Sequence, residues 1–173
     1  KRNSNRIKKI VTMASLASLF KDFQAQTTTY PMGLEIVNAK GCYLYDNNKK
    51  KYLDLVAGVS ACSLGHRHPA VVRAVKRQLG KYLHVMVYGE FVQKEPVLLA
   101  KLLADHLPQQ LNTTYLTNSG TEAIEGALKL AKRVTGRAEI IAANKAYHGN
   151  TMGAMSVMGY ELRKSAYRPL IPG

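Results

Sequence analysis

The order of elements between residues 113 and 143 constrains the fold of this chain most. Residues 113–117, Thr-Thr-Tyr-Leu-Thr, predict a strand, and residues 121–134 place apolar side chains at helical spacing. Gly136 is the expected stop of that helix, and residues 139–143, Glu-Ile-Ile-Ala-Ala, predict a second strand. A strand, a helix and a strand in this order form a parallel sheet covered by helices. We therefore assign the chain to the α/β class.

The residues before this segment predict a smaller region of a different kind. Residues 13–26 have the spacing of a short amphipathic helix, and residues 34–56 hold three short apolar segments separated by polar turns. We expect an antiparallel meander from those three segments. Two further helices are predicted, one from Pro69 to Gly80 and one over residues 93–107.

On this basis we divide the chain into three parts. Residues 1–12 form a basic tail that we expect to lie outside the fold, and residues 13–64 carry the first helix and the meander. Residues 65–173 begin a larger sheet domain. Two strands alone would leave the sheet edges unpaired and the apolar helices without cover, so we interpret the chain as truncated.

Composition narrows the class of function. The 2 cysteines, Cys42 and Cys62, form no disulfide framework, and Lys or Arg interrupts every apolar stretch that could span a bilayer. We therefore expect a cytoplasmic protein without a membrane partner. The formal net charge of +14 raises the question of nucleic acid, but no nucleic-acid motif lies among the basic residues. We interpret most of them as a solvated surface.

A polar turn at residues 117–123, Thr-Asn-Ser-Gly-Thr-Glu-Ala, is the strongest chemical signal. It lies where a predicted strand meets a helix, so unpaired N–H groups and the helix dipole favour a bound phosphate. Gly120 allows close approach of the backbone, and Ser119 or Thr121 can donate a hydroxyl. A simple helix cap, with Glu122 as a first-turn acid, explains the same residues, and the turn alone does not decide between the two.

A second signal follows the second predicted strand. Tyr147 can lay its ring against a flat cofactor, His148 can form a hydrogen bond nearby, and Gly149 leaves room. Both signals lie at the carboxyl edge of the predicted sheet, where ligands of open α/β sheets bind. The simpler alternative is an aromatic residue and a glycine that merely end a strand.

A metal site is a weaker interpretation of Gly-His-Arg-His-Pro at residues 65–69. His66 and His68 are only two residues apart, and no carboxylate in the motif completes a ligand set, even with Cys62 upstream. We expect no metal, and we expect a histidine at this position to order the loop before the following helix.

Four motifs in a shared order carry a resemblance to a known family: residues 41–54, residues 65–69, Asn-Ser-Gly-Thr-Glu-Ala at 118–123 and Tyr-His-Gly at 147–149. Together they resemble the class III pyridoxal-phosphate aminotransferases, from about Phe20 to the end of the chain. The resemblance implies fold type I and pyridoxal 5′-phosphate as the cofactor. It extends to enzymes that act on acetylornithine, ornithine, 4-aminobutyrate and ω-amino acids.

The resemblance also implies roles for individual residues. In the family the Ser-Gly-Thr turn binds the cofactor phosphate and the aromatic residue before His-Gly stacks on the cofactor ring. These roles fall on a set of cofactor-binding candidates and a pair that lines the substrate end of the site. The cofactor-binding candidates are Ser119, Gly120, Thr121, Tyr147 and His148, and the substrate-lining candidates are Val59 and Ser60.

The implied activity is transfer of an amino group between an amino acid or ω-amine donor and a keto acid, in a homodimer. We expect the lysine that forms the Schiff base beyond Gly173, so residues 1–173 alone should be inactive. Several relatives carry Arg directly after His-Gly as a carboxylate clamp, and Asn150 takes that position here. Two alternatives remain: a basic module that contacts nucleic acid or an acidic surface, and an inactive fragment.

Overall fold

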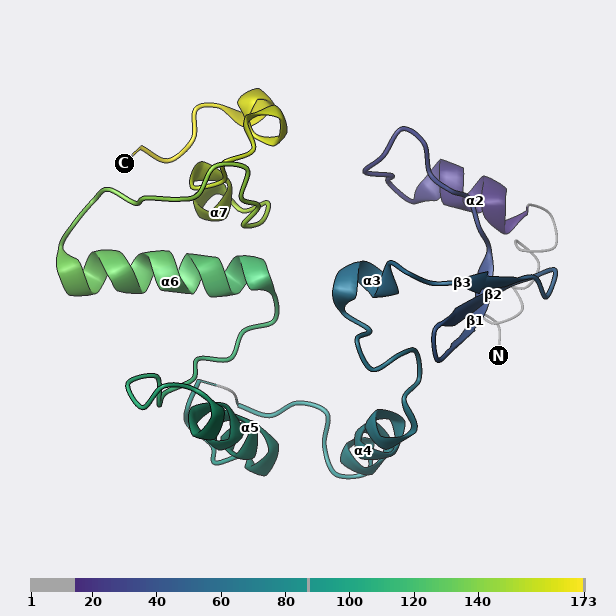
Figure 1. The fold of residues 1–173 in the computed structure, drawn as a ribbon, viewed down its shortest axis with the longest axis horizontal. Helices are drawn as coiled ribbons and strands as arrows, with labels where there is room; N and C mark the ends of the chain where they lie inside the picture. Colours follow the sequence, from purple (N-terminus) through teal and green to yellow (C-terminus); the bar gives the residue numbers. More distant parts are fainter. Residues whose placement is uncertain (1–14, 87, 173) are drawn as a thin grey trace. The chain divides into compact units, whose positions relative to one another are not determined.

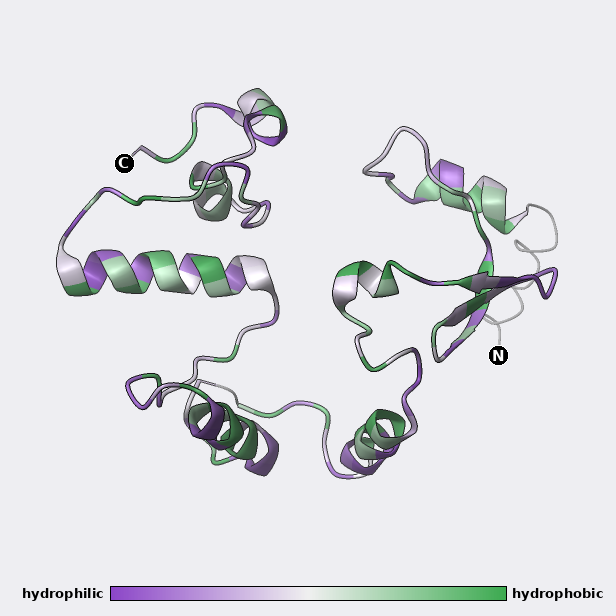
Figure 2. Ribbon diagram, in the orientation of Figure 1, coloured by the Kyte–Doolittle hydropathy of each residue, from purple (hydrophilic) through white to green (hydrophobic). Residues whose placement is uncertain are grey.

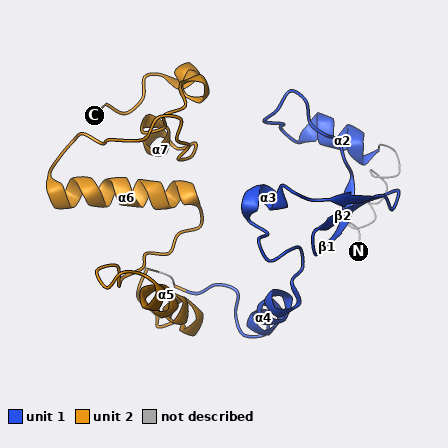
Figure 3. Cartoon of the chain, viewed as in Figure 1, with its two compact units in different colours: residues 1–85 blue, residues 86–173 orange. Residues whose placement is uncertain are grey.

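The chain forms two compact units (Figure 3). A computed structural model describes residues 15–86 and 88–172. Unit 1 comprises residues 1–85 and unit 2 comprises residues 86–173. The basic tail predicted at residues 1–12 lies outside the described residues.

Unit 1 contains the predicted meander (Figure 1). Strands β1 (Ile36–Lys40), β2 (Tyr43–Asp46) and β3 (Lys51–Leu53) form an antiparallel sheet in the order β1-β2-β3. Asp46 fixes the turn between β2 and β3, because its carboxylate accepts hydrogen bonds from two backbone N–H groups of the turn and from the Tyr52 hydroxyl. The prediction of three locally paired strands is confirmed.

The described residues of unit 1 also contain three helical segments, of 8, 4 and 11 residues. Helix α2 (Leu16–Phe23) starts at Ser15, whose hydroxyl accepts a hydrogen bond from the backbone of Ser18. It is shorter than the helix predicted over residues 13–26 and lies within it. Helix α4 (Pro69–Leu79) begins with its proline and ends before Gly80, as predicted. A short turn, α3 (Ala57–Ser60), was not expected.

Unit 2 is built on two long helices and a compact C-terminal part. Helices α5 (Lys94–His106) and α6 (Gly120–Thr135) confirm the predictions to within a few residues, and α6 ends at Gly136 with φ of 68°. Both helices show an apolar and a polar side in Figure 2. Helix α7 (Met152–Ser156) follows, and two 3-10 turns, η1 (Glu161–Arg163) and η2 (Ser165–Tyr167), complete the unit.

The small core of unit 2 surrounds α7. Ala154 and Met155 of this helix are buried, and Met158 just after it is only 1% exposed. By contrast, the leucines of α5 remain between 36% exposed, at Leu103, and 55% exposed, at Leu102. The apolar side of α5 is therefore still largely open in the described part of the chain. None of the helices described has both the length and the apolar composition that crossing a bilayer requires.

The two predicted parallel strands are wrong for the described residues. Neither residues 113–117 nor residues 139–143 form a strand. The backbone of a parallel strand pairs only with neighbouring strands that come from distant parts of a sequence. The described residues supply no such neighbour, whereas each strand of the meander pairs with the next one along the chain.

Candidate functional site

Side chains cap the N-terminus of α6, but they leave some of its backbone N–H groups without an acceptor. Ser119 is the N-cap, and its hydroxyl oxygen accepts from the backbone N–H of Glu122 at 3.2 Å. The Glu122 carboxylate in turn accepts from the backbone N–H of Asn118 at 2.7 Å. The backbone N–H groups of Gly120 and Thr121 form no hydrogen bond within residues 15–86 and 88–172. Two donors therefore remain free at the positive end of a 16-residue helix.

The space beside these donors is open. A Cβ atom added to Gly120 would meet no heavy atom within 4 Å. A helix start with free N–H groups and open space suits a compact anion such as a phosphate group. The Glu122 carboxylate is already bound to the backbone of Asn118, which offsets part of its repulsion of such an anion.

The second predicted motif lies directly against the first. Gly149 is buried, and a Cβ atom added to it would overlap the Thr121 hydroxyl and lie 2.7 Å from the Thr121 Cβ. Its φ of 129° is also one that side-chain-bearing residues rarely adopt. Only glycine therefore fits this contact. The structure thus brings together the turn at Ser119–Thr121 and the loop that carries Tyr147.

The hydroxyl of Tyr147 is hydrogen-bonded, and the residue as a whole is exposed. The hydroxyl donates to Asn150 Oδ1 at 3.1 Å, and the residue is 55% exposed. An anchored aromatic ring with uncovered surface suits stacking on a flat ligand. His148 lies elsewhere, in a hollow lined by residues 140–143 and the apolar side of α6. It forms no hydrogen bond within the described residues.

Sequence reasoning missed Glu125, one turn after Thr121 on α6. Its carboxylate accepts hydrogen bonds from the Thr151 hydroxyl and, at 3.1 Å, from the backbone N–H of Ala154 at the start of α7. The Thr151 hydrogen bond is the main reason that the pKa of Glu125 lies below its usual value. Its partners lie 26 and 29 residues further along the chain, so the sequence carried no signal of this role.

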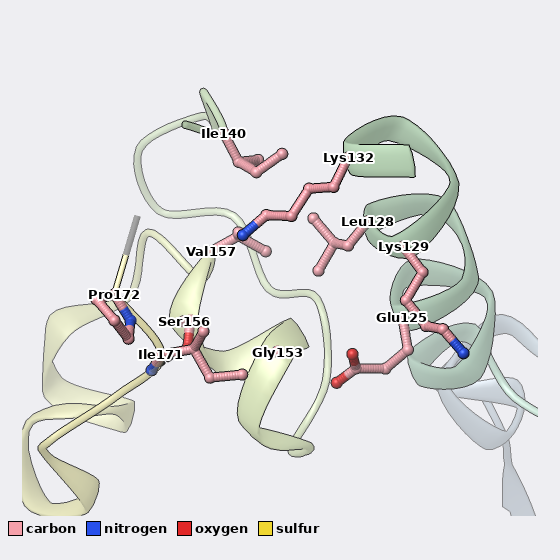
Figure 4. A pocket seen from close by; sticks show the side chains of 10 residues that line it. All are labelled: Glu125, Leu128, Lys129, Lys132, Ile140, Gly153, Ser156, Val157, Ile171 and Pro172. Carbon is pink, nitrogen blue, oxygen red and sulfur yellow. Dashed lines mark hydrogen bonds between the residues drawn. The ribbon is translucent and has the colours of Figure 1, made fainter. Parts of the chain in front are cut away.

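Figure 4 shows how Glu125 reaches α7. Its carboxylate points toward Gly153, where a Cβ atom would overlap the carboxylate, so this glycine too permits a close contact. The cavity beside it, of about 170 Å³, is also bordered by Lys129 and Lys132 of α6. Two contacts on one side of α6, at Thr121 and at Glu125, therefore fix the loop that carries Tyr147.

The substrate-lining candidates Val59 and Ser60 belong to unit 1 and form a separate group. They lie in α3, where φ is 58° at Val59 and 65° at Ser60. Both side chains are exposed. Their turn begins beside Asp54, a second residue that the sequence analysis did not single out.

Asp54 and His66 are paired. The Asp54 Oδ2 atom lies 2.6 Å from His66 Nε2, and Oδ1 accepts from the backbone N–H groups of Val56 and Ala57. The hydrogen bond with His66, followed by the one from Ala57, lowers the pKa of Asp54 below its usual value. His66 thus orders its loop, as expected, through a carboxylate. No group of three or more His, Cys, Asp or Glu in the described ranges is arranged to hold a metal ion.

Comparison with known proteins places this architecture in a family. The class III aminotransferase family model matches residues 24–173. A putative [LysW]-aminoadipate semialdehyde/glutamate semialdehyde transaminase of Pyrococcus abyssi is 42% identical over 146 residues, which cover 83% of this chain and 38% of that protein. Acetylornithine aminotransferase of Bacillus anthracis is 35% identical over 158 residues, which cover 91% of this chain and 38% of the relative.

The solved structures that this chain resembles are aminotransferases as well. Adenosylmethionine-8-amino-7-oxononanoate aminotransferase of Methanocaldococcus jannaschii superposes with a TM-score of 0.84 at 32% identity, over 91% of this chain and 38% of that one. Ornithine aminotransferase of Toxoplasma gondii, in which pyridoxal phosphate partly occupies the active site, gives 0.78 at 26% identity, over 97% and 42%.

The fold is that of the type I pyridoxal-phosphate-dependent aminotransferases, which confirms the assignment to the α/β class. The chain belongs to the class III aminotransferase family. It spans 38% of the length of the curated relatives described above.

Proposed function

We propose that the protein containing residues 1–173 is, over its full length, an aminotransferase dependent on pyridoxal 5′-phosphate. It transfers an amino group between an amino acid or ω-amine donor and a keto acid. The contact of Gly149 with Thr121 is the observation that carries this proposal. It brings an aromatic loop to the helix start with free N–H groups, and a phosphate and a flat ring are the two ends of this cofactor.

The residues present fit the cofactor. The N–H groups of Gly120 and Thr121 bind the phosphate, with a hydroxyl from Ser119 or Thr121, and Tyr147 lies against the ring. His148, which lines the hollow beside residues 140–143, is the remaining cofactor-binding candidate, through a hydrogen bond near the ring. When bound, the cofactor supplies an electron sink for the bond changes at the donor carbon. The protein's part at these positions is to anchor the phosphate and to fix the plane of the ring.

The remaining assignments are also proposals. Val59 and Ser60 line the substrate end, and the lysine that binds the cofactor covalently follows residue 173 in the complete protein. Residues 65–173 then form the first part of the cofactor-binding domain. A homodimer in the cytoplasm is proposed as well, on the basis of the family and of two free cysteines that suit a reducing compartment.

The test measures cofactor binding and transamination with the complete protein. The unmodified protein should bind pyridoxal phosphate and transfer amino groups from at least one of ornithine, N-acetylornithine and 4-aminobutyrate to 2-oxoglutarate. Gly120→Val fills the open space beside the two free N–H groups. Loss of hydrogen bonds to a charged group should weaken cofactor affinity by about a hundredfold. Unchanged affinity in this variant, or a native protein that binds no cofactor, would contradict the proposal.

A further inference from the structure

Four consecutive residues in unit 1 have a left-handed backbone. The φ values are 50° at Ala57, 61° at Gly58, 58° at Val59 and 65° at Ser60. Two backbone hydrogen bonds, from Ser60 N to Val56 O and from Cys62 N to Ala57 O, close this left-handed turn. Left-handed helical geometry costs about 1–2 kcal/mol for each residue other than glycine. A β-branched residue such as Val59 is particularly unsuited to it.

Burial does not offset this cost. Val59 is 87% exposed, and Ser60 is exposed as well. The turn therefore holds an unfavourable backbone and also leaves an apolar side chain in solvent. Backbone strain of this kind persists only where surrounding structure enforces it, and it gathers at functional sites.

Asp54 enforces the conformation at the entry to the turn. Its Oδ1 atom accepts from the N–H groups of Val56 at 3.0 Å and Ala57 at 2.9 Å. Its Oδ2 atom meets His66 Nε2 at 2.6 Å. Because an ionised carboxylate only accepts hydrogen bonds, Nε2 carries the proton in this contact. The Asp54 side chain is only 8% exposed.

Both members of the pair are tied to the sheet. The backbone N–H of Asp54 donates to Cys42 O at 2.9 Å. His66 exchanges two backbone hydrogen bonds with Gly41, at 2.8 and 3.0 Å. Gly65 also lies close to Gly41. A Cβ atom at Gly65 would lie 3.2 Å from Gly41 O, so a larger residue there would press on the strand connection. A rigid hairpin therefore supports the strained turn through one carboxylate and one imidazole.

We propose that Asp54 and His66 are positioning residues that hold this turn so that Val59 and Ser60 contact the amino donor, and that they thereby determine which donors are accepted. This inference rests on the proposed aminotransferase function. The pair touches neither the donor nor the cofactor itself. Its effect on the reaction passes entirely through the geometry of the turn.

The chain offers a matched control within the same unit. Asp46 also accepts hydrogen bonds from two backbone N–H groups, those of Asn48 and Lys50, and from one side chain, that of Tyr52. It holds a hairpin turn with no predicted contact to substrate. Asp46→Asn and Asp54→Asn therefore each remove the negative charge and convert one of the two acceptor oxygens into a donor, and only the second weakens the support of the left-handed turn.

The experiment compares these two variants in the complete protein. Steady-state kinetics with 4-aminobutyrate and with N-acetylornithine give kcat and KM for a short and a long donor. Asp54→Asn should change the ratio of kcat/KM between the two donors by about tenfold, mainly through KM. Cofactor affinity should stay within about twofold of the unmodified protein. Asp46→Asn should lower the melting temperature comparably and leave the donor ratio unchanged.

Variants of His66 separate positioning from general destabilisation. Gln can still donate a hydrogen bond to Asp54, so His66→Gln should largely keep the donor ratio, whereas His66→Leu should change it as Asp54→Asn does. An unchanged ratio in both Asp54→Asn and His66→Leu would overturn the proposal. So would an equal change in Asp46→Asn.

Failure of the proposed function would look different. An unmodified protein that transaminates none of the donors would contradict the activity itself. Amide hydrogen exchange at residues 57–60 then tests the positioning role directly. Faster exchange in Asp54→Asn than in Asp46→Asn would support it, and equal exchange would overturn it.

Discussion

Each unit fixes one exposed loop with a carboxylate, and the two do so by different physical means. In unit 1, Asp54 holds the left-handed turn Ala57–Ser60 through its hydrogen bonds to the turn and to His66. In unit 2, Glu125 holds the start of α7, and the loop before it also packs on α6 through Gly149. The first loop depends on charge and hydrogen bonding, while the second depends in addition on space that only glycine leaves. Substitutions that change size should therefore affect unit 2 more strongly.

The largest effect should come from Gly149→Ala. The new methyl group would overlap the Thr121 side chain and force the Tyr147 loop away from the start of α6. We expect cofactor affinity to fall by a hundredfold or more, on the order of the loss from a misplaced binding group. Equilibrium titration of the apoprotein with pyridoxal phosphate measures this.

Gly89→Ala is the matched control for that change. Gly89 also lies in unit 2 and has a positive φ, of 79°, but a Cβ atom there would meet nothing within 4 Å. The backbone cost alone, about 1 kcal/mol, should lower stability and leave cofactor affinity unchanged. If the two variants weaken cofactor binding equally, the contact between Gly149 and Thr121 is not what fixes the loop.

Removal of the Glu125 carboxylate should have the next largest effect. Glu125→Ala leaves the Thr151 hydroxyl and the N–H of Ala154 without their acceptor. Loss of hydrogen bonds to a charged group should reduce the free energy of unfolding by about 2 kcal/mol and cofactor affinity by about tenfold. Denaturant unfolding and cofactor titration measure the two. Glu139→Ala, an exposed acid in the same unit, should change neither.

The elements that the sequence predicted correctly are the ones that local interactions define. Helix α4 begins at Pro69 and α6 ends at Gly136, and both signals act within a few residues of the helix ends. The meander follows because each strand pairs with its neighbour along the chain. Strands over residues 113–117 and 139–143 were predicted from their own residues alone, but a strand forms only where a partner backbone is present.

The residues of the candidate site likewise fall into two groups, those with a local sequence pattern and those without one. The Ser119 cap and the glycine after it could be recognised in the sequence, because a cap is a local pattern. The roles of Asp54 and Glu125 could not, since their partners are chosen by the tertiary fold. Each accepts from a side chain distant in sequence, His66 and Thr151 respectively. A lone carboxylate in a sequence carries no sign of such a partner.

Low pH should reduce the stability that Asp54 and Glu125 give to their loops, by less than the substitutions above. Hydrogen bonds from His66 and from Thr151 are the main causes that lower the pKa values of Asp54 and Glu125 in the folded protein. Carboxyls with a depressed pKa stabilise the fold above their ordinary value, near 4, and lose that contribution as the pH falls through the folded-state pKa. Unfolding measured between about pH 5 and pH 2 should lose stability less steeply in Asp54→Asn and Glu125→Gln than in the unmodified protein. Equal slopes would show that neither carboxylate stabilises its loop as an ion.

The smallest effect should come from the hydrogen bond that orients the Tyr147 ring. Tyr147→Phe and Asn150→Ala each remove this exposed hydrogen bond, which joins the Tyr147 hydroxyl to Asn150 Oδ1, and keep the ring. A net value of about 1 kcal/mol corresponds to a loss of about fivefold in cofactor affinity for either variant. Because both changes remove the same interaction, the double variant should lose no more than either single one. Additive losses would mean that Asn150 acts on the cofactor site independently of Tyr147. The Tyr147 loop would then be held by its contacts with Thr121 and Glu125 of α6, without help from the hydrogen bond to Asn150.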